Sequence, residues 1–262
     1  MNETAGTIRR PGLAGLLAAY RFGLPAVISR GRILGALALL VLVVIQFTAL
    51  SPRDLAGSGV SITAVMVGLV VGVLVPVFTV STASNVLGSS VADGTLVYPW
   101  LRPTPRWQLA LGHVGAALTL NLPVAAVTTV GASLAVLNAG GGLGSPDAGS
   151  LVGASLAAGA AAALAYTPLV VALGARFKRA STFAFVYIFL LEGLFARNST
   201  GIGRISIQTY VRSVYFGFSR EDPSTAQLGR VVSPGVAWMV IAGLVVAGTG
   251  LTALVLKRSN VE

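Results

Sequence analysis

The sequence predicts an all-α integral membrane protein with six transmembrane helices, an N-terminal interfacial helix and a short cytosolic helix between the second and third spans. Six apolar stretches reach or approach the roughly 20 residues needed to cross a hydrocarbon core of about 30 Å. The composition is 55% hydrophobic and only 10% charged, whereas about a quarter of the residues in a soluble domain are charged. No connection is long enough to bury a separate soluble core, so residues 1–262 form a single polytopic domain.

The first element, residues 1–30, combines a polar cytosolic tail with a helix expected over residues 11–29. Leucines and Tyr20 recur there at helical spacing with Arg21 among them, which is typical of a helix lying along the membrane interface. The fifth span is the shortest, and it lengthens if residues 180–182 belong to it. Residues 196–230 are expected to form an extracytoplasmic loop, in which residues 203–218 form short external or re-entrant helices. The six spans are expected at residues 33–50, 60–83, 109–137, 151–173, 183–195 and 234–256.

The distribution of basic residues predicts that both termini are cytosolic. Lysine and arginine near span ends favour the cytosolic side. With this orientation the chain is a multi-pass protein of the cell membrane, plasma or inner. Twelve of the 18 basic residues then lie inside: Arg9, Arg10, Arg21, Arg30, Arg32, Arg102, Arg106, Arg176, Lys178, Arg179, Lys257 and Arg258.

Several kinds of chemistry are absent from the sequence. There is no cysteine, so disulfides and thiolate metal sites are excluded. The two lysines, Lys178 and Lys257, do not belong to a P-loop, and the single histidine, His113, cannot form a zinc-protease motif. We expect His113 to be a neutral or snorkelling side chain at the interface. The chain is therefore expected to hold no cofactor or metal, and its net charge of +10 is attributed to topology rather than to nucleic-acid binding.

Small residues recur one turn apart in several spans. Such residues allow close helix packing in lipid, where apolar association has no hydrophobic drive. We expect packing within the chain, with a dimer interface as the alternative. The sets are Gly31 with Gly35, Gly68 with Gly72, and Ala154 with Ala158 and Ala162.

Polar residues inside the spans are candidates for a transport path or gate. Glu192 is the one acid in a predicted span, where a charged group costs about 2.5–3.5 kcal/mol. It either lines a pathway or pairs with Arg197, Arg204 or a backbone group. Asn121 and Tyr166 are further pathway candidates, and interhelical hydrogen bonding is the alternative for both.

The loop at residues 84–106, SNVLGSSVADGTLVYPWLRPTPR, carries the most specific signal. A short helix is expected to begin near Asp93 and to end before Pro103, because proline disfavours helix continuation. Its apolar face is expected to be buried, either in the membrane interface or against another protein. The apolar face comprises Leu96, Val97, Trp100 and Leu101.

The order of these elements resembles the permease subunit of an ABC type-2 exporter. In that family an interfacial helix precedes two spans, and a cytosolic loop with a glycine-threonine-leucine step and then a proline-arginine step leads into the third span. The resemblance implies a second permease copy or a related permease, and separate cytosolic ABC ATPase subunits that bind ATP and magnesium. It also implies that the loop couples the ATPase to the spans through Asp93, Gly94, Thr95, Leu96, Val97, Trp100, Leu101, Arg102 and Arg106.

Two other classes remain open at this point. A secondary transporter or channel would work without an ATPase and is expected to show internal repeats and ionisable groups at mid-membrane. We find no repeat, and Glu192 stands alone. A membrane scaffold or an integral membrane enzyme is the third class, and the catalytic cluster that an enzyme needs is not visible in the sequence.

Overall fold

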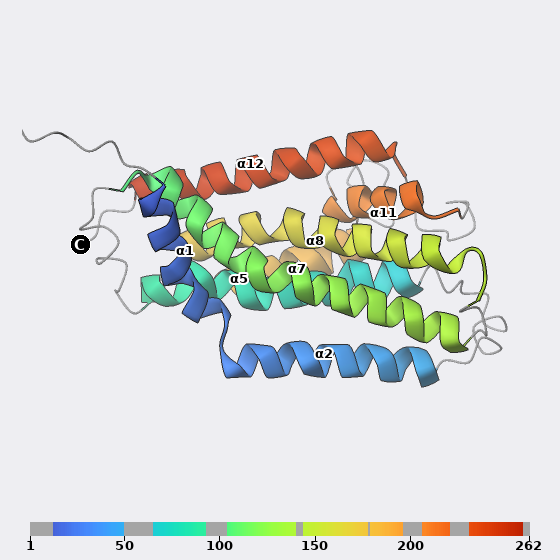
Figure 1. Cartoon of the computed structure of the whole chain (residues 1–262). Coiled ribbons are helices and arrows are strands. Elements are labelled where there is room, and N and C mark those ends of the chain that lie inside the picture. Colours follow the sequence, from blue (N-terminus) through green and yellow to red (C-terminus); the bar gives the residue numbers. More distant parts are fainter. Residues whose placement is uncertain are drawn as a thin grey trace, which may run out of the picture.

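The fold is known from a computed structural model that describes residues 13–49, 65–92, 104–139, 144–177, 179–195, 206–220 and 231–258. Across these ranges every regular element is helical, which confirms the all-α class (Figure 1). Two elements, η1 and η2, are π-helical. The elements are α1 (Ala14–Val27), α2 (Arg30–Ala49), η1 (Met66–Leu74), α5 (Val75–Ala92), α7 (Arg106–Ala139), α8 (Ala148–Arg176), α9 (Ala180–Val186), η2 (Tyr187–Phe195), α11 (Ile207–Phe218) and α12 (Pro234–Arg258).

The long helices run side by side, with α7 and α8 at the centre of the bundle and α2 and α12 on opposite sides (Figure 1). Helix α8 packs against α5, α7, α11 and α12, which explains its small-residue composition. Ala154, Ala158 and Ala162 are fully buried in the core, so the expected packing within the chain is confirmed for this set.

Four helices are long and apolar enough to cross a membrane: Met66–Gly88, Arg106–Asn138, Ala148–Arg176 and Pro234–Arg258. Helices α1 and α2 form a pair bent by 65°, which makes a fifth if the pair is one span. The helix at Ala180–Leu190 is apolar but shorter. The structure thus supports a membrane protein with four or five such helices. Residues 180–182 belong to the same helix as the start of the predicted fifth span, but this helix is shorter than the four long ones.

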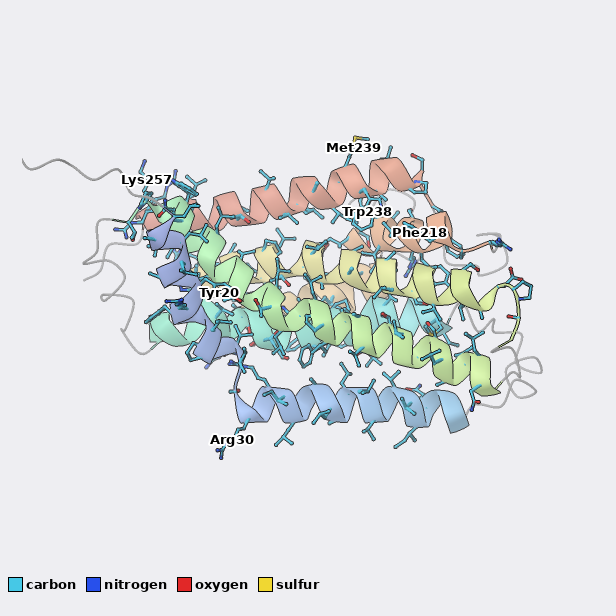
Figure 2. The ribbon with its side chains drawn as sticks, in the orientation of Figure 1. Tyr20, Arg30, Phe218, Trp238, Met239 and Lys257 are labelled. Atoms are coloured by element: carbon cyan, nitrogen blue, oxygen red, sulfur yellow. The ribbon has the colours of Figure 1, made fainter. Side chains whose placement is uncertain are left out.

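Basic helix ends gather at one end of the bundle. Figure 2 shows Arg30 and Lys257 at this end and Trp238 and Phe218 at the other. In the part of the chain that the structure describes, the one ion pair, Asp147 with Arg220 at 3.3 Å, lies beyond the opposite end of α8. A bundle with basic residues concentrated at one end is typical of a membrane protein.

Helix α1 lies directly against α7. A Cβ atom on Gly112 would stand only 2.5 Å from Cβ of Ala19, so only glycine permits this approach. His113 is 1% exposed, and its Nδ1 lies 2.7 Å from the carbonyl oxygen of Leu109. The α1–α7 contact covers the ring, with Gly23 packed against it, so the expectation of a snorkelling His113 is wrong.

Two of the glycine predictions can be judged from their surroundings. The expected packing of Gly31 and Gly35 is not found against the part of the chain that the structure describes, where a Cβ atom at either position would meet nothing within 4 Å. Gly72 lies in a close contact, since a Cβ atom there would stand 2.9 Å from Nε2 of Gln208. Helical spacing identifies a shared face, but it does not say which face turns inward.

The contact between α8 and α12 gives a matched test of packing. A Cβ atom on Gly248 would lie 2.8 Å from the carbonyl carbon of Pro168, whereas one on Gly250 would meet nothing. We expect Gly248→Ala to destabilise the protein by about 1–3 kcal/mol, because the two helices must separate. Gly250→Ala should be neutral or slightly stabilising, because alanine favours the helix. Thermal unfolding of both variants in one detergent measures this, and equal midpoints would contradict the packing.

Candidate functional site

The candidate site is centred on the carboxylate of Glu192 in η2. The side chain is 1% exposed. It accepts hydrogen bonds from the hydroxyl of Tyr166 in α8 and, at 3.2 Å, from the hydroxyl of Tyr187 at the start of η2. Tyr187 and Glu192 are five positions apart, the separation that a π-helix brings together along one face. The structure thus joins two of the predicted residues, Glu192 and Tyr166.

The same carboxylate caps helix α11. The backbone N–H of Ile207 donates to Oε1 of Glu192 at 2.9 Å, and that of Gln208 lies 3.4 Å from the same oxygen. Ser206 occupies the N-cap position but makes no capping bond to the backbone with its own side chain. Because the first amides of a helix have no partner within the helix, and its N-terminus carries partial positive charge, a buried anion is favourable here. Of the alternatives for Glu192, the structure thus shows a bond to backbone groups, whereas Arg197 and Arg204 lie outside the described residues.

Helix α11 is also tied to η1 through its first turn. The side-chain amide of Gln208 donates to the carbonyl oxygen of Gly72. Its own oxygen accepts from Nη2 of Arg212 at 2.7 Å, and Arg212 is only 6% exposed. Gln208 thus connects the carboxyl group at the helix N-terminus with the guanidinium group of Arg212 one turn later. Such a buried network stabilises one arrangement of its helices only when its members are satisfied together.

Asn121 belongs to a different polar network. Its Oδ1 accepts from the hydroxyl of Thr82 in α5 at 2.5 Å, and its Nδ2 donates to Thr167 in α8 at 3.0 Å. All three residues are buried, with exposed fractions of 1% or less. Asn121 therefore joins three helices at the centre of the bundle, as expected for interhelical hydrogen bonding in a membrane protein.

An apolar cavity of about 470 Å³ adjoins the Glu192 site. Tyr166 and Tyr187 line one part of it, and Arg176 and Phe177 line another, at the end of α8. The walls between are aliphatic side chains of α8, α9 and α12, among them Leu169, Leu173, Leu251 and Val255. The volume falls within the range of small-molecule sites.

Most of the predicted coupling residues lie outside the described part of the chain. Asp93, Gly94, Thr95, Leu96, Val97, Trp100, Leu101 and Arg102 belong to this group. Arg106 is the first residue of α7. Nearby, Thr104 and Gln108 contact Gly15 of α1, so the end of the loop touches the first helix.

Tyr187, Gln208, Arg212 and the cavity are not predicted by the sequence patterns. One sequence pattern indicates part of this network: Gln208 and Arg212 are four residues apart on an amphipathic helix, a spacing that brings their side chains together. The bond from Gln208 to Gly72 joins residues 136 apart, and no local pattern indicates it.

Comparison with known proteins does not assign the chain to a family. No family model matches it, and no curated protein is significantly similar to it.

The capping role of Glu192 is tested by comparing the stability of variants at two acidic residues, the buried Glu192 and the exposed Asp147. Glu192→Ala leaves buried hydroxyl and amide donors without an acceptor, and each such group costs about 1–3 kcal/mol. Glu192→Gln keeps one acceptor oxygen and should have an intermediate effect. Asp147→Ala removes an exposed ion pair with side chains 73% and 67% exposed, so it should change stability by about 1 kcal/mol or less. Thermal unfolding in detergent measures all three, and equal effects of Glu192→Ala and Asp147→Ala would contradict the cap.

Proposed function

We propose that the chain is the membrane-spanning permease subunit of an ATP-driven transporter, an exporter of the ABC type-2 kind. The observation that carries this proposal is the loop at residues 84–106, where the resemblance to that family is concentrated. In this proposal the loop faces the cytosol together with both termini, and α1 lies along the cytosolic membrane surface. ATP and magnesium bind in separate ATPase subunits, and a second permease completes the path.

The packing of α1 supports a route for coupling. Residues 84–92 of the predicted loop belong to the end of α5, and Arg106 begins α7, so a force on the residues between them acts on both helices. Thr104 and Gln108 touch Gly15, and Gly112 lies against Ala19 one turn later. A displaced loop helix would thus move α1 and α7 together, as rigid elements that shift between two packed states.

The Glu192 network supplies a candidate gate in the other half of the bundle. It holds α11, a helix of 12 residues, between η1, η2 and α8. Two of these neighbours are π-helical, a geometry found frequently at functional sites. Release of the α11 cap would change the packing of all three elements at once.

Secondary transport is the second candidate, and the buried Glu192 and Arg212 favour it. Ionisable groups inside a membrane protein commonly lie on ion or proton pathways. The two candidates differ in their energy source. Transport that depends on ATP and on a co-purifying ATPase supports the permease, whereas transport driven by a proton or sodium gradient alone supports the second candidate.

The coupling role of the loop is tested with two tryptophans. Trp100→Ala should weaken association with the ATPase by roughly thirtyfold, because truncating a buried aromatic anchor often costs about 2 kcal/mol or more. Trp107→Ala is the control, since Trp107 is 51% exposed at the start of α7 and should affect only its depth in the membrane. Pull-down with the ATPase and transport assays compare the variants. Normal binding and transport in Trp100→Ala would show that the loop is not the coupling element.

A further inference from the structure

The cavity beside α8 has the depth of one leaflet of a bilayer. Its lining extends along α8 from Tyr166 to Arg176. Ten residues of α-helix rise about 15 Å, which is half of a hydrocarbon core of about 30 Å. Arg176 belongs to the last turn of α8, at the basic end of the bundle. In a membrane that α8 crosses, the cavity would therefore extend from the surface at the basic end toward the middle.

The lining of the cavity favours an apolar occupant over water. Apart from the two tyrosines and Arg176, every lining residue is apolar. The hydroxyls of Tyr166 and Tyr187 donate to Glu192, so they are already occupied. A buried water needs two to four polar partners, and these walls do not offer them.

The mouth of the cavity carries positive charge. Arg176 is exposed and its guanidinium carbon lies 5.7 Å from the ring centre of Phe177. Within the described ranges Arg176 has no carboxylate at ion-pairing distance. Arg179 is also exposed and follows three residues later. An anionic group near the membrane surface is attracted by such arginines.

We propose that this cavity binds one acyl chain of an anionic phospholipid from the leaflet at the basic end of the bundle, with the headgroup phosphate at Arg176. The acyl chain lies against Leu169, Leu173, Leu251 and Val255 and ends near Tyr166. Because Tyr166 and Tyr187 bind Glu192, the lipid supports the wall that holds the α11 cap. The inference goes beyond the proposed function, since it holds for any transport mechanism.

Native mass spectrometry of the full chain released from detergent tests this site. The probes are phosphatidylglycerol and phosphatidylcholine with identical acyl chains. We expect the wild-type protein to retain one phosphatidylglycerol in preference to phosphatidylcholine. Arg176→Gln should reduce this preference about fivefold. Arg258→Gln is the control, because Arg258 is exposed at the same end of the bundle and does not line the cavity.

Filling the cavity provides the second arm of the test. Leu173→Trp on α8 and Leu251→Trp on α12 should each abolish retention of the lipid, because the indole occupies the space of the acyl chain. Met239→Trp is the control, since Met239 is 67% exposed on the outer face of α12 (Figure 2). The thermal midpoint of each variant identifies any that fails to fold, and two positions on different helices keep the test decisive.

Three results would overturn the inference. Equal retention of the two phospholipids by the wild type would exclude an anionic headgroup site. Unchanged retention in folded Leu173→Trp and Leu251→Trp would place the lipid elsewhere. A second copy of the chain that covers the cavity and prevents lipid exchange would identify a protein interface in its place.

Discussion

The backbone N–H groups at the start of the short helix α11 need hydrogen-bond acceptors from elsewhere in the protein. The Glu192 carboxylate provides this acceptor. Twelve residues rise only about 18 Å, too little to cross a hydrocarbon core. Ser206, Ile207 and Gln208 are buried, so the backbone groups at this helix end are shielded from water and require partners in the protein. Glu192 accepts from Ile207 and Gln208, and Gln208 in turn reaches Gly72. These bonds link α11 to η1 and η2, and the bond from Tyr166 to Glu192 adds α8 to the same network.

Close helix contacts supply the second constraint. Lipid offers no hydrophobic drive for association, so helices gain by approaching until their backbones nearly touch. Gly112 permits this between α7 and α1, and Gly248 permits it between α12 and α8. Fully buried alanines fill the centre of α8. An apolar cavity remains between α8, α9, η2 and α12, and this is the cavity for which we propose a phospholipid chain.

Much of the architecture could be predicted from the sequence, because apolar length and composition determine long helices in a membrane protein. The starts of the third, fourth and sixth predicted spans agree with α7, α8 and α12 to within a few residues. The partners of Glu192 could not be predicted in the same way, since Tyr166 and Ile207 reach it from elements far apart in sequence. Gly31 and Gly35 show the limit of spacing rules, because no described residue lies within 4 Å of a Cβ atom placed on either of them. The role of the loop at residues 84–106 stays a prediction.

Amide hydrogen exchange at the start of α11 tests the central claim most directly. First-turn amides of a helix normally exchange quickly because they lack partners within the helix. The account predicts slow exchange at Ile207 and Gln208, which donate to the buried Glu192, and fast exchange at Gly235 and Val236 in the exposed first turn of α12. Exchange at Ile207 and Gln208 as fast as at Gly235 and Val236 would contradict the capping of α11 by Glu192 and the network that links α11 to η1, η2 and α8.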